Sequence, residues 1–131
     1  MGSISQGLAE WAAGLDFASI PADVAAVTKL RILDVIGVCV SGRRSAVGAG
    51  IEKAAREFSA RSTGLAFAPA GATLFPLFNA FANGTLAAAL DYDDTHNSTL
   101  IHPSNPATCA ILGLAADRPI AGRDLIVSVA A

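Results

Sequence analysis

The 131-residue chain has little charge, few aromatic residues and almost no cysteine. Its net charge is −2 and its longest basic run is Arg43–Arg44, which argues against nucleic acid as a partner. The two cysteines, Cys39 and Cys109, lie in apolar stretches, which is typical of small buried residues in a reducing compartment and not of a disulfide scaffold. The first residues have neither the basic nor the apolar region of a signal peptide. We therefore expect a cytoplasmic protein.

Charge is missing altogether between Arg61 and Asp91, a gap long enough to span a membrane. Two prolines and the side-chain amides of Asn79 and Asn83 lie within it, and these groups are costly in lipid. We therefore expect a buried core helix preceded by an irregular stretch, and no membrane partner. Hydrophobic residues make up 53% of the chain, which excludes a disordered protein and provides enough apolar surface for a core.

Apolar residues recur at helical spacing along the chain and predict an all-α fold of about six helices in one domain, residues 1–131. Ser3 and Asn105 fit the N-caps of the first and fifth helices, and Gly42 fits the stop of the second. The last helix has only begun at the final residue, so we expect the chain to end within an element. The expected helices cover about residues 3–14, 21–41, 47–58, 76–90, 106–116 and 122–131.

Three polar residues interrupt the helices that should be most buried. Asp34 lies in a half of the second helix that is apolar on nearly every face, so we expect a buried or half-buried acid paired with Lys29 or Arg31. Asn79 and Asn83 are four residues apart on one side of the fourth helix, and we expect them to hydrogen-bond neighbouring loops.

Polar residues are concentrated in the segment 91–105, which holds both histidines of the chain. Because it joins two helices that should be buried, a functional site is expected there, although such a loop also suits plain helix capping. Asp93, Asp94 and His96 offer oxygen and imidazole ligands for a metal ion. Magnesium-dependent all-helical enzymes add a third acid three residues after an Asp-Asp pair, and Asn97 occupies that position here. The sequence is therefore only weak evidence for a metal site.

Acid–base chemistry at carbon fits the same segment better. A carboxylate and a histidine in separate environments can divide the roles of general base and general acid, and Asp91 and His102 could approach a substrate from two sides. Nucleophilic hydrolysis is disfavoured, because no serine here lies in a nucleophile-elbow pattern. Side chains that could donate hydrogen bonds to substrate carboxylates follow along the loop: Thr95, Ser98, Ser104 and Asn105.

Three motifs in this order, Asn83–Thr85, Ala89–His96 and His102–Ser104, resemble the MmgE/PrpD family. Its members include 2-methylcitrate dehydratase of propionate metabolism, cis-aconitate decarboxylase and iminodisuccinate epimerase. The resemblance extends over nearly the whole chain, with weaker matches at 33–38 and 122–125. It implies a lyase acting on a small polycarboxylate without a metal or other cofactor. It also implies a homodimer, in which this all-helical part is followed by an α/β domain.

The resemblance assigns a role to three residues of this sequence. Asp91, Thr95 and His102 match positions that line the family's active site, and we expect them to be catalytic. Two further polar residues of the loop, Asn97 and Ser104, are expected to bind substrate. The sequence does not decide which of the catalytic groups is the acid and which the base.

The family's catalytic lysine and second histidine come later in its sequence and have no counterpart here. We therefore expect the 131 residues to be an N-terminal portion that is inactive alone and associates through an exposed apolar face. Asp93 and Asp94 match the acidic motif and are expected to be mainly structural. Two alternatives remain: a non-catalytic helical module that assembles with a partner, and a magnesium-dependent helical enzyme that uses Asp93 and Asp94.

Overall fold

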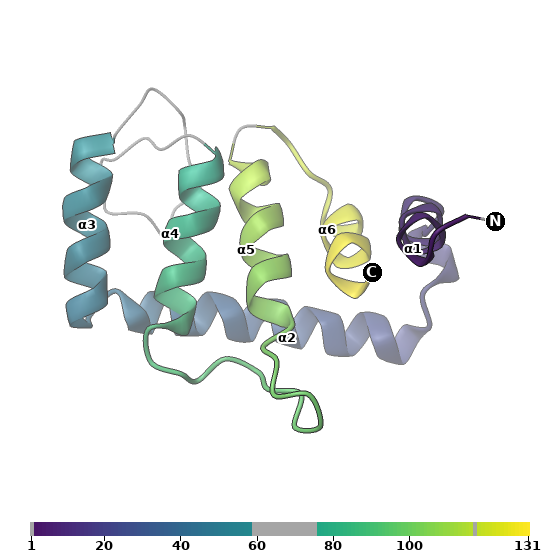
Figure 1. Ribbon diagram of the computed structural model, residues 1–131, viewed down its shortest axis with the longest axis horizontal. Helices are drawn as coiled ribbons and strands as arrows, with labels where there is room; N and C mark the ends of the chain where they lie inside the picture. Colours follow the sequence, from purple (N-terminus) through teal and green to yellow (C-terminus); the bar gives the residue numbers. More distant parts are fainter. Residues whose placement is uncertain (1, 59–75, 117) are drawn as a thin grey trace.

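The computed structural model describes residues 2–58, 76–116 and 118–131. In these ranges the chain forms α-helices, one short 3-10 helix and no β-strand, which confirms the all-α fold (Figure 1). None of the described helices is long and apolar enough to cross a membrane. The irregular stretch expected before Pro76 lies outside the described residues. The elements are α1 (Ile4–Ala13), η1 (Phe17–Ser19), α2 (Ala22–Gly42), α3 (Ala46–Phe58), α4 (Pro76–Ala88), α5 (Ser104–Ala115) and α6 (Gly122–Ala130).

The longest helix, α2, is the base on which α4, α5 and α6 pack, and α3 packs against α4. Figure 1 shows α3, α4 and α5 side by side across it, with α6 next to α5. The core lies where α2, α3, α4 and α5 meet, and most of its side chains are small or medium-sized. Its buried members are Val35, Val38, Cys39, Ile51, Ala82, Leu86, Ala87 and Cys109.

Glycine lets these helices approach closely. A Cβ on Gly42 would overlap the carbonyl group of Leu86, so the last turn of α2 lies directly against the backbone of α4. A Cβ on Gly113 would lie 2.8 Å from both the Pro76 carbonyl oxygen and the Ala80 Cβ, which places α5 equally close to α4. Gly42 therefore provides close packing inside the end of α2 and is not the residue that follows the helix.

The expected ends of the helices are only partly correct. Ser3 caps α1, since its Oγ accepts a hydrogen bond from the Gln6 amide at 3.1 Å. Asn105 was expected to cap the fifth helix, and this is wrong: α5 starts at Ser104, with Pro103 in the cap position. Asn105 lies inside the first turn of α5, and its side chain donates a hydrogen bond to the Gly84 carbonyl of α4. It can therefore also contact the loop that precedes α5.

The expectation of a buried Asp34 is also wrong, because the described helices cover only one face of α2. Asp34 is exposed, and Leu30 and Leu33 beside it are 65% and 64% exposed. Arg31 pairs with Asp94, at 3.3 Å, and not with Asp34. Asn83 is fully buried as expected, but neither of its side-chain polar atoms has a hydrogen-bond partner among the described residues.

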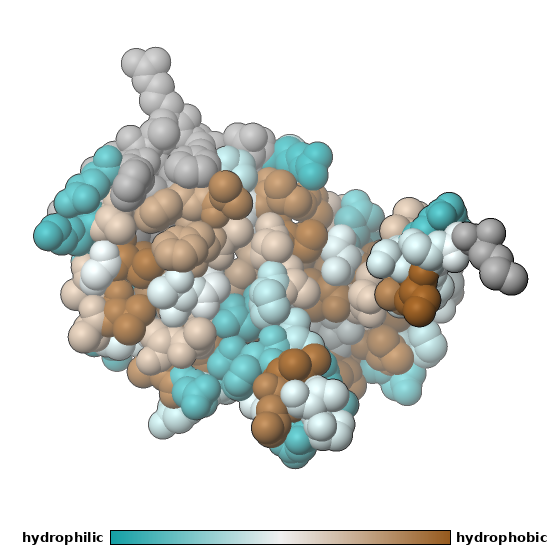
Figure 2. Space-filling model, in the orientation of Figure 1, coloured by the Kyte–Doolittle hydropathy of each residue, from teal (hydrophilic) through white to brown (hydrophobic). Residues whose placement is uncertain are grey.

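The first helix keeps its apolar stripe on the surface. Ile4, Leu8 and Trp11 are 86%, 61% and 52% exposed, and no residue of α1 is buried. Figure 2 shows hydrophobic surface, in brown, close to the N-terminus, at the far end of the molecule from α3. A second apolar area lies over α4, where Leu77 and Phe81 are exposed. Together with the outer face of α2, the molecule therefore exposes large apolar groups on α1, α2 and α4.

Candidate functional site

The segment between α4 and α5 forms a loop that projects beyond the ends of both helices (Figure 1). It begins with Asp91 in the left-handed backbone region, at φ 53°, which turns the chain sharply away from α4. Farther on, the His96 amide donates to the Ile101 carbonyl at 2.8 Å and closes a short turn, in which Leu100 also has a positive φ. This turn brings the chain back so that His102 lies next to residues 91–95.

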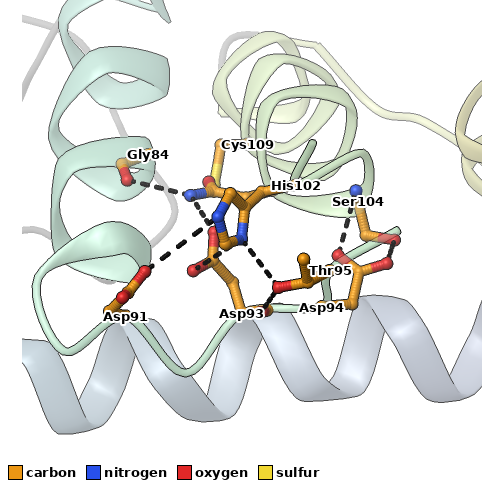
Figure 3. A network of polar contacts seen from close by, with 9 residues as sticks. Gly84, Asp91, Asp93, Asp94, Thr95, His102, Ser104 and Cys109 are labelled. Atoms are coloured by element: carbon orange, nitrogen blue, oxygen red, sulfur yellow. Dashed lines mark hydrogen bonds and ion pairs between the residues drawn. The ribbon is translucent and has the colours of Figure 1, made fainter. Parts of the chain in front are cut away.

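The His102 ring is the centre of the site (Figure 3). Its Nδ1 lies 3.5 Å from Asp93 Oδ1 and 3.4 Å from Thr95 Oγ1. Its Nε2 lies 4.0 Å from Asp91 Oδ1. The Asp91 side chain is 91% exposed, that of His102 38% and that of Asp93 only 3%. The structure thus brings Asp91, Thr95 and His102 together, with one carboxylate open to solvent and another buried beneath the ring.

The buried carboxylate of Asp93 is held by Asn105. Asn105 Nδ2 donates to Asp93 Oδ2 at 3.0 Å and to the Gly84 carbonyl at 3.2 Å. Its Oδ1 accepts a hydrogen bond from the Cys109 thiol at 3.3 Å. One amide therefore connects α4, the loop and α5. This role of Asn105 was missed from the sequence alone. An asparagine in front of a proline is typical of a helix cap, and its actual partners lie 12 and 21 residues away, where no local sequence pattern indicates them.

Cys109 contacts a second buried thiol, Cys39 of α2. The neighbouring Cys39 thiol and burial raise the pKa of Cys109 far above its usual value. Cys39 directs its own thiol proton to the Asn83 carbonyl, 3.2 Å away. The proton of Cys109 is therefore left for Asn105.

The third acid of the motif, Asp94, points away from His102 (Figure 3). Its Oδ2 accepts a 2.6 Å hydrogen bond from the Ser104 hydroxyl, and its Oδ1 accepts one from the Ser104 amide at 3.1 Å. Asp94 thereby satisfies the first backbone donor of α5 and also pairs with Arg31. Ser104 is 4% exposed and its hydroxyl proton is used by Asp94. Its expected contact with substrate stays a prediction.

Two further residues singled out in the sequence lie apart from this cluster. Asn97 is exposed, in the turn closed by the His96 and Ile101 bridge. His96 is exposed, and its Nδ1 lies 2.8 Å from the Thr99 hydroxyl. The structure does not bring Asn97 to the His102 ring, and its expected role in substrate binding is untested.

A cation could be held by a different set of ligands from the one suggested by the sequence. Ligand atoms of Asp91, Asp93 and His102 all lie within 4.8 Å of one another. Oxygen and imidazole donors of this kind suit divalent metal ions. Asp94 and His96 are not members of this group, because they bond to Ser104 and Thr99.

Fold and site together define a helical domain in which the loop between two packed helices carries aspartate, threonine and histidine around one point. The comparison with known families agrees with this description, since residues 6–131 match the model of the MmgE/PrpD N-terminal domain. The chain therefore belongs to the MmgE/PrpD family, and the resemblance of its motifs is confirmed. Among curated proteins, none matches this chain.

Proposed function

We propose that this domain supplies the proton-transfer residues of a lyase that acts by elimination or decarboxylation on a small polycarboxylate such as 2-methylcitrate. One observation carries the proposal: Asp91 lies beside Nε2 and Thr95 beside Nδ1 of the His102 ring, whose side chain is 38% exposed. A general base must lie within hydrogen-bond reach of the proton that it removes. The exposed part of the His102 side chain and the Asp91 carboxylate are accessible to a bound substrate.

In the proposed elimination, one of these groups takes the proton from the carbon next to a substrate carboxylate. The electron pair of that C–H bond forms the new double bond, and the hydroxyl on the adjacent carbon leaves with a proton as water. Thr95 lies beside His102 and would orient the substrate through its hydroxyl group. In a decarboxylation, the same groups would protonate the carbanion that remains after carbon dioxide leaves.

Among the described residues, positive charge near the loop is scarce. Arg31 is the cation that pairs with an acid of the loop in that part of the chain, and that acid, Asp94, already offsets its charge. A substrate with several carboxylates needs several such groups. We therefore propose that further cationic residues come from outside these 131 residues, within a cytoplasmic homodimer. On this basis the chain alone should not turn over substrate.

The test is an assay of 2-methylcitrate dehydration and cis-aconitate decarboxylation, with the chain alone and with any adjacent reading frame that carries the rest of the family pattern. We expect activity from the pair only. His102→Ala and Asp91→Asn should reduce kcat by about 100-fold or more, as loss of a general acid or base does. His96→Ala and Asp124→Asn are matched controls, since these residues lie outside the cluster. Activity of the pair that survives both site substitutions would overturn the assignment.

The exposed stripe of α1 favours a second candidate, a helical module that assembles with another chain. Ile4, Leu8 and Trp11 present an apolar face that nothing in the described structure covers. Stable association without activity in any combination of chains would favour this candidate over the lyase.

A further inference from the structure

The surroundings of His102 Nδ1 determine where the neutral ring carries its proton. Asp93 Oδ1, at 3.5 Å, belongs to a carboxylate, which accepts hydrogen bonds and donates none. The Thr95 hydroxyl, at 3.4 Å from Nδ1, can accept a hydrogen bond from the ring, because its own proton can turn to the Asp93 backbone carbonyl. A carboxylate also lies near the other ring nitrogen, but Asp91 is 4.0 Å from Nε2 and is 91% exposed to water, whereas Asp93 is closer and buried. The buried carboxylate therefore decides, and the neutral ring carries its proton on Nδ1.

The Asp93 carboxylate is fixed by a residue that does not touch the ring. Asn105 uses both protons of its Nδ2, one on Asp93 Oδ2 and one on the Gly84 carbonyl. Its Oδ1 accepts the thiol proton of Cys109. Every bond of this amide defines its orientation, since a flipped amide would place Oδ1 against a carboxylate and a carbonyl. Asn105 is 6% exposed, so water does not compete for these partners.

We propose that Asn105 is a positioning residue that, through Asp93, keeps His102 in the tautomer with the proton on Nδ1. Nε2, on the side of Asp91, is then the atom that takes the proton from the substrate carbon and later returns it. The electron pair of the C–H bond stays on carbon, and the imidazolium that forms lies between the carboxylates of Asp93 and Asp91. This step rests on the proposed function, whereas the tautomer itself does not.

The substitution Asp93→Asn tests this arrangement with almost no change in shape. Asn105 Nδ2 would still donate to position 93 and would select the carbonyl oxygen of the new amide. The NH₂ group of that amide would then face His102 Nδ1, which could only accept. We therefore expect the ring to change to the Nε2–H tautomer, which is also the form that free histidine prefers.

The measurement is a long-range ¹H–¹⁵N correlation of the ¹⁵N-histidine-labelled chain, at a pH where both rings are neutral. The wild-type His102 ring should show Nδ1–H, and the Asp93→Asn ring should show Nε2–H. Asn105→Leu should lower the Nδ1–H population of His102, because Asp93 then loses its donor. His96 is the internal control and should not change, since its Nδ1 bonds to Thr99 in the same loop.

Each outcome decides the proposal. An Nε2–H ring in the wild type, or a His102 ring that is unchanged in a folded Asn105→Leu variant, would overturn it. If Asn105→Leu loses the wild-type helix content by circular dichroism, the Asp93→Asn spectrum alone decides. In the active pair of chains, Asn105→Leu should lower kcat about 10- to 100-fold with little change in KM, as outer residues that orient a histidine do. If the His102 tautomer is as expected but no combination of chains shows activity, the positioning role of Asn105 is supported and the proposed lyase function is contradicted.

Discussion

At the scale of single residues, two acids that the sequence places in one motif have opposite environments. Asp91 and Asp93 are two positions apart, yet their side chains are 91% and 3% exposed. The left-handed turn at Asp91 directs one outward, and the bond from Asn105 holds the other inward. The division between a group that meets solvent and a group that orients the ring therefore arises from backbone geometry and burial.

This difference predicts unequal effects on stability. Asp93→Ala leaves Asn105 Nδ2 buried with one partner fewer, and we expect a loss of about 1–3 kcal/mol in the free energy of unfolding. Asp91→Gly removes an exposed side chain at a φ that glycine adopts readily, so its effect should be about 0.5 kcal/mol or less. Urea denaturation followed by circular dichroism measures both. Equal effects would contradict the structural role of Asp93.

The same residues predict weak binding of cations. A metal ion at Asp91, Asp93 and His102 would compete with Thr95 for the ring, and one of its three ligands is a carboxylate that is 91% exposed to water. Isothermal titration with magnesium, manganese and zinc should give dissociation constants no tighter than about 1 mM, the weak end for oxygen-rich sites. A stoichiometric micromolar site that is lost in Asp93→Ala would instead favour a metal-dependent enzyme.

At the scale of helices, the sequence predicts what depends on neighbours in the chain. Ser3 caps α1 because its partner is three residues away, and the apolar periodicity places the described α-helices correctly in order, although it misses the short 3-10 helix η1. Asn105 could not be understood in this way, since its position fits a cap and its partners belong to α4 and to the loop. Asp34 was misplaced because periodicity shows that α2 is apolar and does not show which faces are covered.

Close helix contacts predict opposite effects for two glycine substitutions. Gly113→Ala forces a methyl group to within 2.8 Å of α4, and we expect a loss of about 1–3 kcal/mol from overpacking. Gly37→Ala in α2 meets nothing within 4 Å and should gain about 0.5–1 kcal/mol, because alanine favours a helix over glycine. Thermal unfolding of both variants measures the shifts in Tm. A stabilised Gly113→Ala would mean that α4 and α5 pack less tightly than described.

At the scale of the whole molecule, the apolar surface predicts self-association. Monomers rarely expose large apolar patches, and this chain exposes them on α1 and on α4. Sedimentation velocity should show dimers or larger species. Replacing Leu8 and Trp11 by serine should weaken association if α1 forms the contact, and replacing Leu77 and Phe81 is the matched comparison. A monomer over a wide range of concentration would contradict the expectation.

The reactivity of the two buried thiols can be used to measure how often the core of this protein opens. Cys39 and Cys109 are the only cysteines of the sequence, and they are 1% and 2% exposed. A thiol-specific reagent can therefore modify the chain only when its core opens, and the labelling rate follows the population of that open form. Because Cys109 bonds to Asn105 beneath His102, a molecule that binds at the loop should slow labelling. The labelling rate of these native cysteines can therefore detect binding at the loop even in a chain that has no enzymatic activity.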